Sequence, residues 1–200
     1  MTPEPKTRFT RGKGLLEPYL ARRRASIANR LIPAELRAGR ILDVGCGSFP
    51  YFLAHTAFKE KFAIDQLPPA RENKEIRWHT LDLNTDPALP FGNAYFDVVT
   101  MLAVAEHLNP TSLEKLLTEV HRTLKLGGRV IITTPAAHAD SLLRWMARIG
   151  LVSAEEINEH AFAYTLPLLG WSFGRAGFGL GRVRFGSFEL GLNLWALADK

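Results

Sequence analysis

Ile41-Leu42-Asp43-Val44-Gly45-Cys46-Gly47-Ser48 is the stretch of sequence that decides the fold. Arg40 to Val44 is a short apolar run, which is typical of a buried strand, and the glycines after it predict a tight turn. In an open α/β sheet, parallel strands deliver the chain to the edge at which ligands bind. Because Gly45 and Gly47 have no side chains, the backbone can approach a ligand closely there. The stretch therefore predicts a binding loop at the tip of a strand.

Further apolar runs on the C-terminal side predict more strands, separated in several places by helical spacing. The predicted strands after residues 40–44 cover 61–65, 76–81, 95–101 and 129–134. The clearest helical stripe is Leu113, Leu116, Leu117, Val120 and Leu124. Thr111 with Glu114 predicts its capping box, and Gly127 predicts its stop.

This alternation favours an α/β fold with a Rossmann-like, doubly wound, mostly parallel seven-stranded sheet. Residues 181–198 predict a C-terminal antiparallel hairpin that turns near Gly186-Ser187. The 200 residues fit a single domain, with a loose tail at 1–14, a basic helix at 15–35 and an irregular insertion at 136–165.

The composition, 46% hydrophobic and 22% charged residues, excludes wholesale disorder. No apolar run approaches the roughly 20 residues that a transmembrane helix needs. The N-terminus lacks the apolar region of a signal peptide. Cys46 is the single cysteine, so no internal disulfide can form. We therefore expect a cytoplasmic protein.

Positive charge is concentrated at the N-terminus, where residues 1–40 hold ten Lys/Arg against three acidic residues. This favours either an anionic partner or a solvated helix face preceded by a tail. Arg22-Arg23-Arg24 stands beside Leu16, Tyr19 and Leu20. That neighbourhood suggests the hypothesis of peripheral contact with an anionic membrane, from which a lipid-linked acceptor could enter.

Acidic residues end the next two predicted strands. Asp65 stands twenty residues after Gly45, where a carboxylate can accept both hydroxyls of a ribose. Asp82 can accept from an exocyclic amino group such as that of adenine. The loop continues as Gly45-Cys46-Gly47-Ser48-Phe49-Pro50, without the third glycine of a dinucleotide-binding loop, and the chain has no GxxxxGK[ST] phosphate loop. A nucleotide-dependent dehydrogenase is therefore disfavoured, and the pattern predicts an adenosine-containing ligand without phosphates.

With these motifs, residues 38–136, and more weakly those up to 178, resemble the class I S-adenosylmethionine-dependent methyltransferases. The resemblance is to the small-molecule group that includes the ubiquinone/menaquinone-biosynthesis type. ILDVGCG (41–47) resembles motif I, and LPFGNAYFDVV (89–99) resembles the segment LPFxxxxFDVV. EVHRTLKLGG (119–128) matches the helix and turn before the fifth strand, and Glu159-His160 with Ala176-Gly177-Phe178 echoes the later EH…AGF region.

The resemblance implies S-adenosylmethionine as the cofactor. Asp43 would orient the glycine loop, whose backbone would face the methionine part, and the backbone of Leu83 would meet adenine. The implied cofactor-binding residues are Asp43, Gly45, Cys46, Gly47, Asp65, Gln66, Asp82, Leu83 and Met101.

His107 and His160 are the candidate catalytic bases, because histidine is the side chain best suited to accept a proton at neutral pH. In this family the insertion that carries His160 covers the acceptor. Quinone O-methylating members hold a metal with two glutamates and a histidine, but Ala103 replaces the first glutamate, leaving Glu106-His107. The sequence therefore predicts no metal site.

The favoured acceptor is a small or lipid-like molecule, with oxygen, carbon and nitrogen all left open. One alternative is an RNA methyltransferase, supported by an isoelectric point near 9.6 and by Arg175, Arg182 and Arg184 among aromatic residues. Another is a non-catalytic module that binds S-adenosylmethionine.

Overall fold

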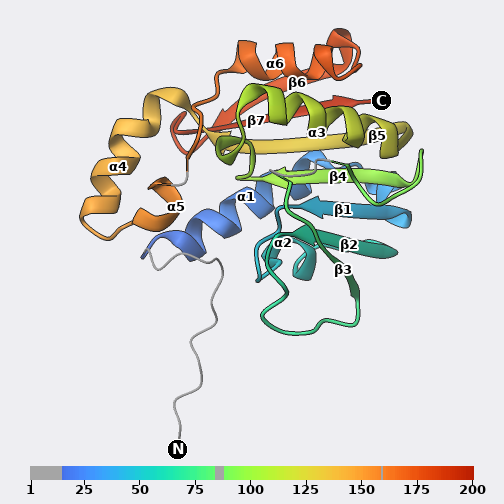
Figure 1. The fold of residues 1–200 in the computed structure, drawn as a ribbon, viewed down its shortest axis with the longest axis horizontal. Coiled ribbons are helices and arrows are strands. Elements are labelled where there is room, and N and C mark those ends of the chain that lie inside the picture. The colour runs from blue at the N-terminus through green and yellow to red at the C-terminus, as the bar shows by residue number, and fades with distance from the viewer. Residues whose placement is uncertain (1–14, 84–87, 159) are drawn as a thin grey trace, which may run out of the picture.

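A seven-stranded sheet forms the centre of the computed structural model, which describes residues 15–83, 88–158 and 160–200. The strand order is β3-β2-β1-β4-β5-β7-β6. β1 to β5 run parallel, and β7 runs antiparallel to both of its neighbours (Figure 1). The strands are β1 (Arg40–Val44), β2 (Glu60–Asp65), β3 (Ile76–Thr80), β4 (Phe96–Leu102), β5 (Leu124–Pro135), β6 (Val183–Phe188) and β7 (Asn193–Asp199). The predicted fold class and terminal hairpin are confirmed.

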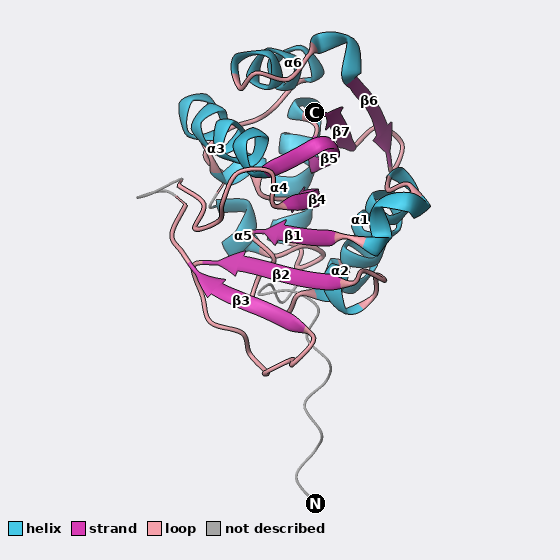
Figure 2. Ribbon diagram, turned by 90° about the vertical axis from the view of Figure 1, so that its right-hand side faces the viewer, coloured by secondary structure: helices cyan, strands magenta, loops and turns pink. Residues whose placement is uncertain are grey.

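Helices cover both faces of the sheet, as Figure 2 shows. One face carries α1 (Glu17–Leu31), η1 (Ala34–Ala38) and α2 (Tyr51–Ala54), and the other carries α3 (Pro110–Thr123) and α6 (Leu166–Arg175). α4 (Asp140–Arg148) and α5 (Ala154–Asn158) lie beyond the carboxyl ends of the parallel strands, at the left of Figure 1. Three short 3₁₀ turns complete the described helices: η2 (Ala105–His107), η3 (Ala137–Ala139) and η4 (Leu180–Arg182).

The strand sequences are apolar on both faces because both faces are covered. In β1, Leu42 and Val44 pack into the core on the side of α3 and α6, whereas Ile41 packs into the core on the side of α1 and α2. In β4 the same alternation sends Val99 to the first core and Val98 to the second. Burial on both sides therefore fixes the register of the central strands.

The predicted caps of α3 are wrong. The side chain of Asn109 accepts from the Ser112 N–H at 2.9 Å, and Pro110 occupies the first turn, so the helix begins before the predicted Thr111/Glu114 box. Glu114 instead pairs with Arg175 on α6 at 3.2 Å. Gly127 does not stop the helix, because α3 ends at Thr123 and Gly127 lies within β5 at φ 77°.

The turn of the C-terminal hairpin also differs from the prediction. Gly186 lies inside β6, where a Cβ would stand 2.4 Å from the ring of Trp195 on β7. The chain reverses at Glu189 and Leu190, both with positive φ, and Gly191 N–H donates to Phe188 C=O at 3.2 Å. Gly186 is thus required for close packing and not for the turn.

Two further predictions concern the N-terminal part and membranes. The basic helix predicted at 15–35 is shorter, because α1 ends at Leu31 and Pro33 separates it from η1. The predicted tail at 1–14 lies outside the described residues. Within the described ranges, no helix has the length and apolar character needed to cross a bilayer.

Gly39, just before β1, generates a stability prediction. A Cβ there would lie 2.0 Å from the Asp97 carboxylate, which accepts from the Arg40 N–H at 2.7 Å and from Lys125 Nζ at 2.8 Å. Gly39→Ala should therefore displace a carboxylate that joins three strands and lower the unfolding free energy by about 1–3 kcal/mol. Urea unfolding measures this, with Gly92→Ala, where a Cβ meets nothing within 4 Å, as the matched control. Equal effects of the two substitutions would contradict this role of Gly39.

Candidate functional site

The glycine loop after β1 needs its two glycines for different reasons. Gly45 and Gly47 have φ of 70° and 66°, which disfavours any residue with a side chain. A Cβ on Gly45 would stand 2.5 Å from a methyl group of Val104, whereas a Cβ on Gly47 would meet nothing within 4 Å. The first glycine thus permits close packing on the segment after β4, and the second leaves open space at the tip of the strand.

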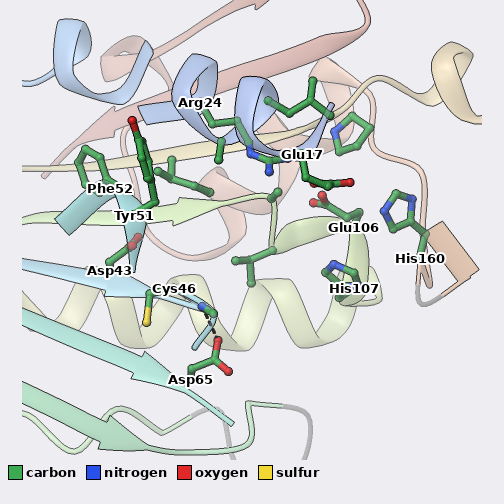
Figure 3. Close-up of a pocket in the computed structure, with 18 of the residues that line it drawn as sticks. Glu17, Arg24, Asp43, Cys46, Tyr51, Phe52, Asp65, Glu106, His107 and His160 are labelled. Atoms are coloured by element: carbon green, nitrogen blue, oxygen red, sulfur yellow. Dashed lines mark hydrogen bonds between the residues drawn. The ribbon is translucent and has the colours of Figure 1, made fainter. Parts of the chain in front are cut away.

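Asp65, at the end of β2, joins two strand tips. Its carboxylate accepts from the Gly47 N–H at 2.8 Å and from the Leu67 N–H at 3.0 Å (Figure 3). A carboxylate has about four lone-pair positions, so acceptor capacity remains for a ligand. The residue predicted to hold a ribose therefore also fixes the shape of the glycine loop.

Asp43 is buried within β1 and contacts the neighbouring strand β4. Its carboxylate accepts from the Thr100 hydroxyl at 2.6 Å. Burial raises the pKa of Asp43 to about 7, the bond from Thr100 lowers it in part, and the charge of Asp65 raises it again. The side chain thus lies below the loop, close to the middle of its titration at neutral pH.

A cavity of about 460 Å³ opens above these strand tips. Eight of the nine predicted cofactor-binding residues line it: Asp43, Gly45, Cys46, Gly47, Asp65, Gln66, Asp82 and Leu83. Met101 is the exception, because its fully buried side chain lies in the core on the side of α3. Leu102 and Ala103 line the cavity in its place. Met101 and Leu102 take opposite faces because successive side chains of a strand alternate, and the assignment of Met101 to the cofactor stays a prediction.

The far end of the cavity is built by segments that sequence reasoning did not connect. Glu17 and Arg24 come from α1, Glu189 comes from the turn after β6, and Asn193 begins β7. Asn193 donates to the Glu189 carboxylate at 2.6 Å, and Arg23 lies 4.0 Å from it. These residues carry no motif, and they meet only because the hairpin folds back beside α1.

His107 and His160, the predicted bases, lie together at this end. Their ring centroids are 5.3 Å apart with the rings nearly perpendicular. Glu106 links them, because its backbone carbonyl accepts from the N–H groups of Ala161 at 2.8 Å and Phe162 at 3.1 Å. Figure 3 shows the Glu106 carboxylate beside both rings. Burial lowers the pKa of His160, although Glu106 opposes the shift.

The insertion at 136–165 forms one wall of the cavity. Apolar side chains come from Leu143 of α4, from Val152 between α4 and α5, and from Ile157 of α5. Ser153, at the start of α5, donates its backbone N–H to the Glu17 carboxylate at 3.1 Å, which fastens the insertion to α1. The cavity therefore has a polar, glycine-lined end at the strand tips and a mixed apolar and acidic end below the insertion.

A family model described as a methyltransferase domain matches residues 16–180. The chain belongs to this methyltransferase family. The predicted resemblance to class I methyltransferases is confirmed, and with it S-adenosylmethionine as the cofactor. Membership of the ubiquinone/menaquinone-biosynthesis group stays a prediction.

Solved structures agree with this methyltransferase fold. A Haloferax volcanii methyltransferase, solved with the activator Trm112, is 17% identical over 92% of this chain and 91% of its own, with a TM-score of 0.70. An S-adenosylmethionine-dependent methyltransferase from Mesorhizobium loti is 17% identical over 94% of this chain and 98% of its own, with a TM-score of 0.62. One from Archaeoglobus fulgidus is 18% identical over 92% of this chain and 94% of its own, with a TM-score of 0.63. At these identities the similarity establishes the fold.

The raised pKa of Asp43 predicts a pH-dependent stability. Between the ordinary value of 3.8 and about 7, the unfolded chain releases the Asp43 proton while the folded methyltransferase keeps it. The contribution of this group to stability is therefore present at low pH and is lost as the pH rises through that window. Asp43→Asn removes this dependence, so the variant should gain stability relative to the wild type between pH 4 and pH 8.

Urea unfolding of both proteins at the two pH values, without cofactor, gives the comparison. The substitution also changes the hydrogen bond to Thr100. Because each protein is compared with itself at the other pH, the effect of that change on stability largely cancels. A stability difference that does not change with pH would contradict the buried, protonated Asp43.

Proposed function

We propose that this methyltransferase transfers the methyl group of S-adenosylmethionine to a small-molecule or lipid-like acceptor by in-line displacement. The observation that carries the proposal is that the tips of β1, β2 and β3 line one cavity with the insertion at 136–165. The three tips contribute the Gly45–Gly47 backbone, Asp65 and the Asp82-Leu83 pair. We assign these to the methionine part, the ribose and the adenine of the cofactor.

The unused hydrogen-bond acceptor positions of the Asp65 carboxylate fit this assignment. Gly47 and Leu67 occupy one position on each carboxylate oxygen, which leaves one further position on each for the two hydroxyls of a ribose. The open space at Gly47 allows a ligand to contact the loop backbone directly. Of the described residues along the cavity, no basic side chain lies at this end, as expected for a ligand without phosphates.

The acceptor is assigned to the other end of the cavity. Bound S-adenosylmethionine supplies an electrophilic methyl group on a sulfonium. The chain must hold the acceptor atom in line with it, and such positioning can lower the barrier by roughly 7–11 kcal/mol. Leu143, Val152 and Ile157 offer apolar contacts to the acceptor. His107 and His160 are the imidazoles along the described cavity wall, and they are placed to take up the acceptor's proton.

Helix α4 favours a lipid-like acceptor. Leu143 lines the cavity. Exposed apolar side chains follow the helix at Leu142 and Trp145 and continue just beyond its end at Ile149. Arg144 and Arg148 flank this stripe. An amphipathic helix with tryptophan and arginine is suited to the surface of a bilayer. We therefore place the hypothesised membrane contact at α4 and the adjoining start of α1, where Leu15 and Tyr19 are exposed.

The RNA alternative has less structural support. Arg24 lines the cavity, and Arg23 lies 4.0 Å from Glu189. Of the C-terminal arginines, Arg175 pairs with Glu114 at 3.2 Å and Arg184 lies 3.7 Å from Asp199, so part of this positive charge is neutralised within the fold. The other alternative, a non-catalytic module that binds S-adenosylmethionine, can be distinguished from an enzyme only by measuring whether a methyl group is transferred.

Removal of the Asp65 carboxylate tests the cofactor assignment. Asp65→Ala should weaken S-adenosylmethionine binding by about 1–3 kcal/mol, because the ribose hydroxyls lose their acceptor. Because Asp65 also holds Gly47, a loss of loop shape has to be distinguished from a loss of direct contact. Calorimetry with adenosine and 2′-deoxyadenosine on both proteins forms a double-mutant cycle. The preference of the wild type for adenosine should disappear in the variant; a preference that persists would place the ribose elsewhere.

A labelled-methyl screen tests the acceptor class. Extracted small molecules, isoprenoid quinones, glycolipids and RNA are incubated with the protein and S-adenosylmethionine labelled in the methyl group. We expect label in a small-molecule or lipid fraction, and less of it with Asp65→Ala when S-adenosylmethionine is below saturation, because the variant binds the cofactor more weakly. Label in RNA would favour the alternative acceptor, and absence of label from all fractions would favour a binding module.

A further inference from the structure

Glu106, His107 and His160 present three potential metal ligands at the acceptor end of the cavity. Their ligand atoms, one carboxylate oxygen and two imidazole nitrogens, all lie within 4.8 Å of one another. Two histidines and one carboxylate form a set typical of catalytic zinc and of non-haem iron sites, which leave coordination positions open. We infer that these three residues bind a divalent transition-metal cation, with zinc as the best-matched ion.

The sequence predicted no metal because Ala103 stands where a glutamate ligand would be expected. The sequence also lacks the Cys/His clustering that is typical of a zinc site. The structure brings His160 from the insertion to the Glu106-His107 pair, so the third ligand comes from a part of the chain that no local motif includes. The proposed site therefore has one glutamate and two histidines as ligands, instead of two glutamates and one histidine.

The surroundings hold the carboxylate in place before any ion binds. Glu106 is 3% exposed, and the hydroxyl of Thr134 on β5 donates to its Oε2 at 3.0 Å. The hydrogen bonds from Ala161 and Phe162 to the Glu106 carbonyl fix the backbone next to His160. A bound metal ligand commonly has such a supporting hydrogen bond, which orients it and increases its affinity for the ion.

The spacing of the ligands is close to what an ion requires. Ligand atoms around tetrahedral zinc lie about 3.4 Å apart, given zinc–nitrogen distances of about 2.0–2.1 Å. Since the ligand atoms lie within 4.8 Å of one another, they would move closer by at most about 1.4 Å when an ion binds. The two histidines can do this because their side chains border the cavity and are only half-buried. The fourth position would then face the acceptor end of the cavity.

A cation at this position changes the role of the two histidines, and this consequence rests on the proposed function. A hydroxyl acceptor bound to the ion has a lowered pKa and releases its proton to solvent, so no imidazole has to accept it. Its oxygen forms the new bond to the methyl carbon, and the electron pair of the broken carbon–sulfur bond stays on sulfur. Metal binding itself does not depend on this step.

Metal binding can be measured directly on the full-length protein. After treatment with a chelator and its removal, the wild type is titrated with Zn²⁺ by calorimetry and with Co²⁺ by visible absorption, without S-adenosylmethionine. We expect one ion per chain. His160→Asn should weaken binding at least 10-fold, and Thr134→Val, which leaves all three ligands in place, should weaken it about 10- to 100-fold.

His138→Asn is the matched control, because His138 is exposed on η3 in the same insertion but is not part of the cluster. It should bind Zn²⁺ as the wild type does. If the wild type takes up no stoichiometric ion, or if His160→Asn and His138→Asn bind alike, the metal site is overturned. Calorimetry with S-adenosylmethionine on the same samples shows whether the variants are folded, and it tests the cofactor site separately.

Discussion

The hydrogen bond from Gly47 N–H to the Asp65 carboxylate is the constraint on which the cofactor end depends. It forms because β1 and β2 run parallel with Val44 opposite Ile64, which places Gly45 N–H 2.7 Å from the Ile64 carbonyl and brings Asp65 beside the loop. That register is fixed in turn by side chains buried on both faces of the sheet. A slip of one residue would turn Asp65 away from the loop and expose part of the core. Core packing and ligand geometry are therefore determined by the same pairing.

Glu106 has the corresponding role at the acceptor end. Its carboxylate receives a hydrogen bond from β5, and its carbonyl receives two from the segment after His160. A buried carboxylate is costly unless it is hydrogen-bonded or paired, so its retention next to two imidazoles calls for a compensating partner. Thr134 supplies part of that compensation. The cation proposed for this site would supply the rest.

The sequence was most informative where local pattern and tertiary environment coincide. β1, the glycine loop and Asp65 were predicted because buried parallel strands are apolar throughout and glycines with positive φ follow them. Met101 does not line the cavity, and the sequence could not show this because a pattern of buried residues does not say which face of β4 a side chain takes. Gly186 was predicted to form a turn, but its position is determined by close contact with Trp195. Gly127 was predicted to end a helix, but its N–H donates to the carbonyl of Lys200 at the edge of the strand pair. Glu17, Glu189 and Asn193 could not be found, because the fold alone brings α1 beside the hairpin.

The basic N-terminal region shows how folding changes the meaning of net charge. Arg37 donates to Asn29 and Thr56, and Arg40 pairs with Glu60 at 2.9 Å, so both hold the sheet and its helices together. Arg24 lines the cavity together with Glu17 and Glu189. Its positive charge makes this part of the wall less negative than the two carboxylates alone would. These three arginines of the N-terminal region therefore have structural contacts or line the cavity. The described wall of this cavity thus brings carboxylates, one guanidinium and two imidazoles together, so the charges of its acidic residues are partly balanced within the fold.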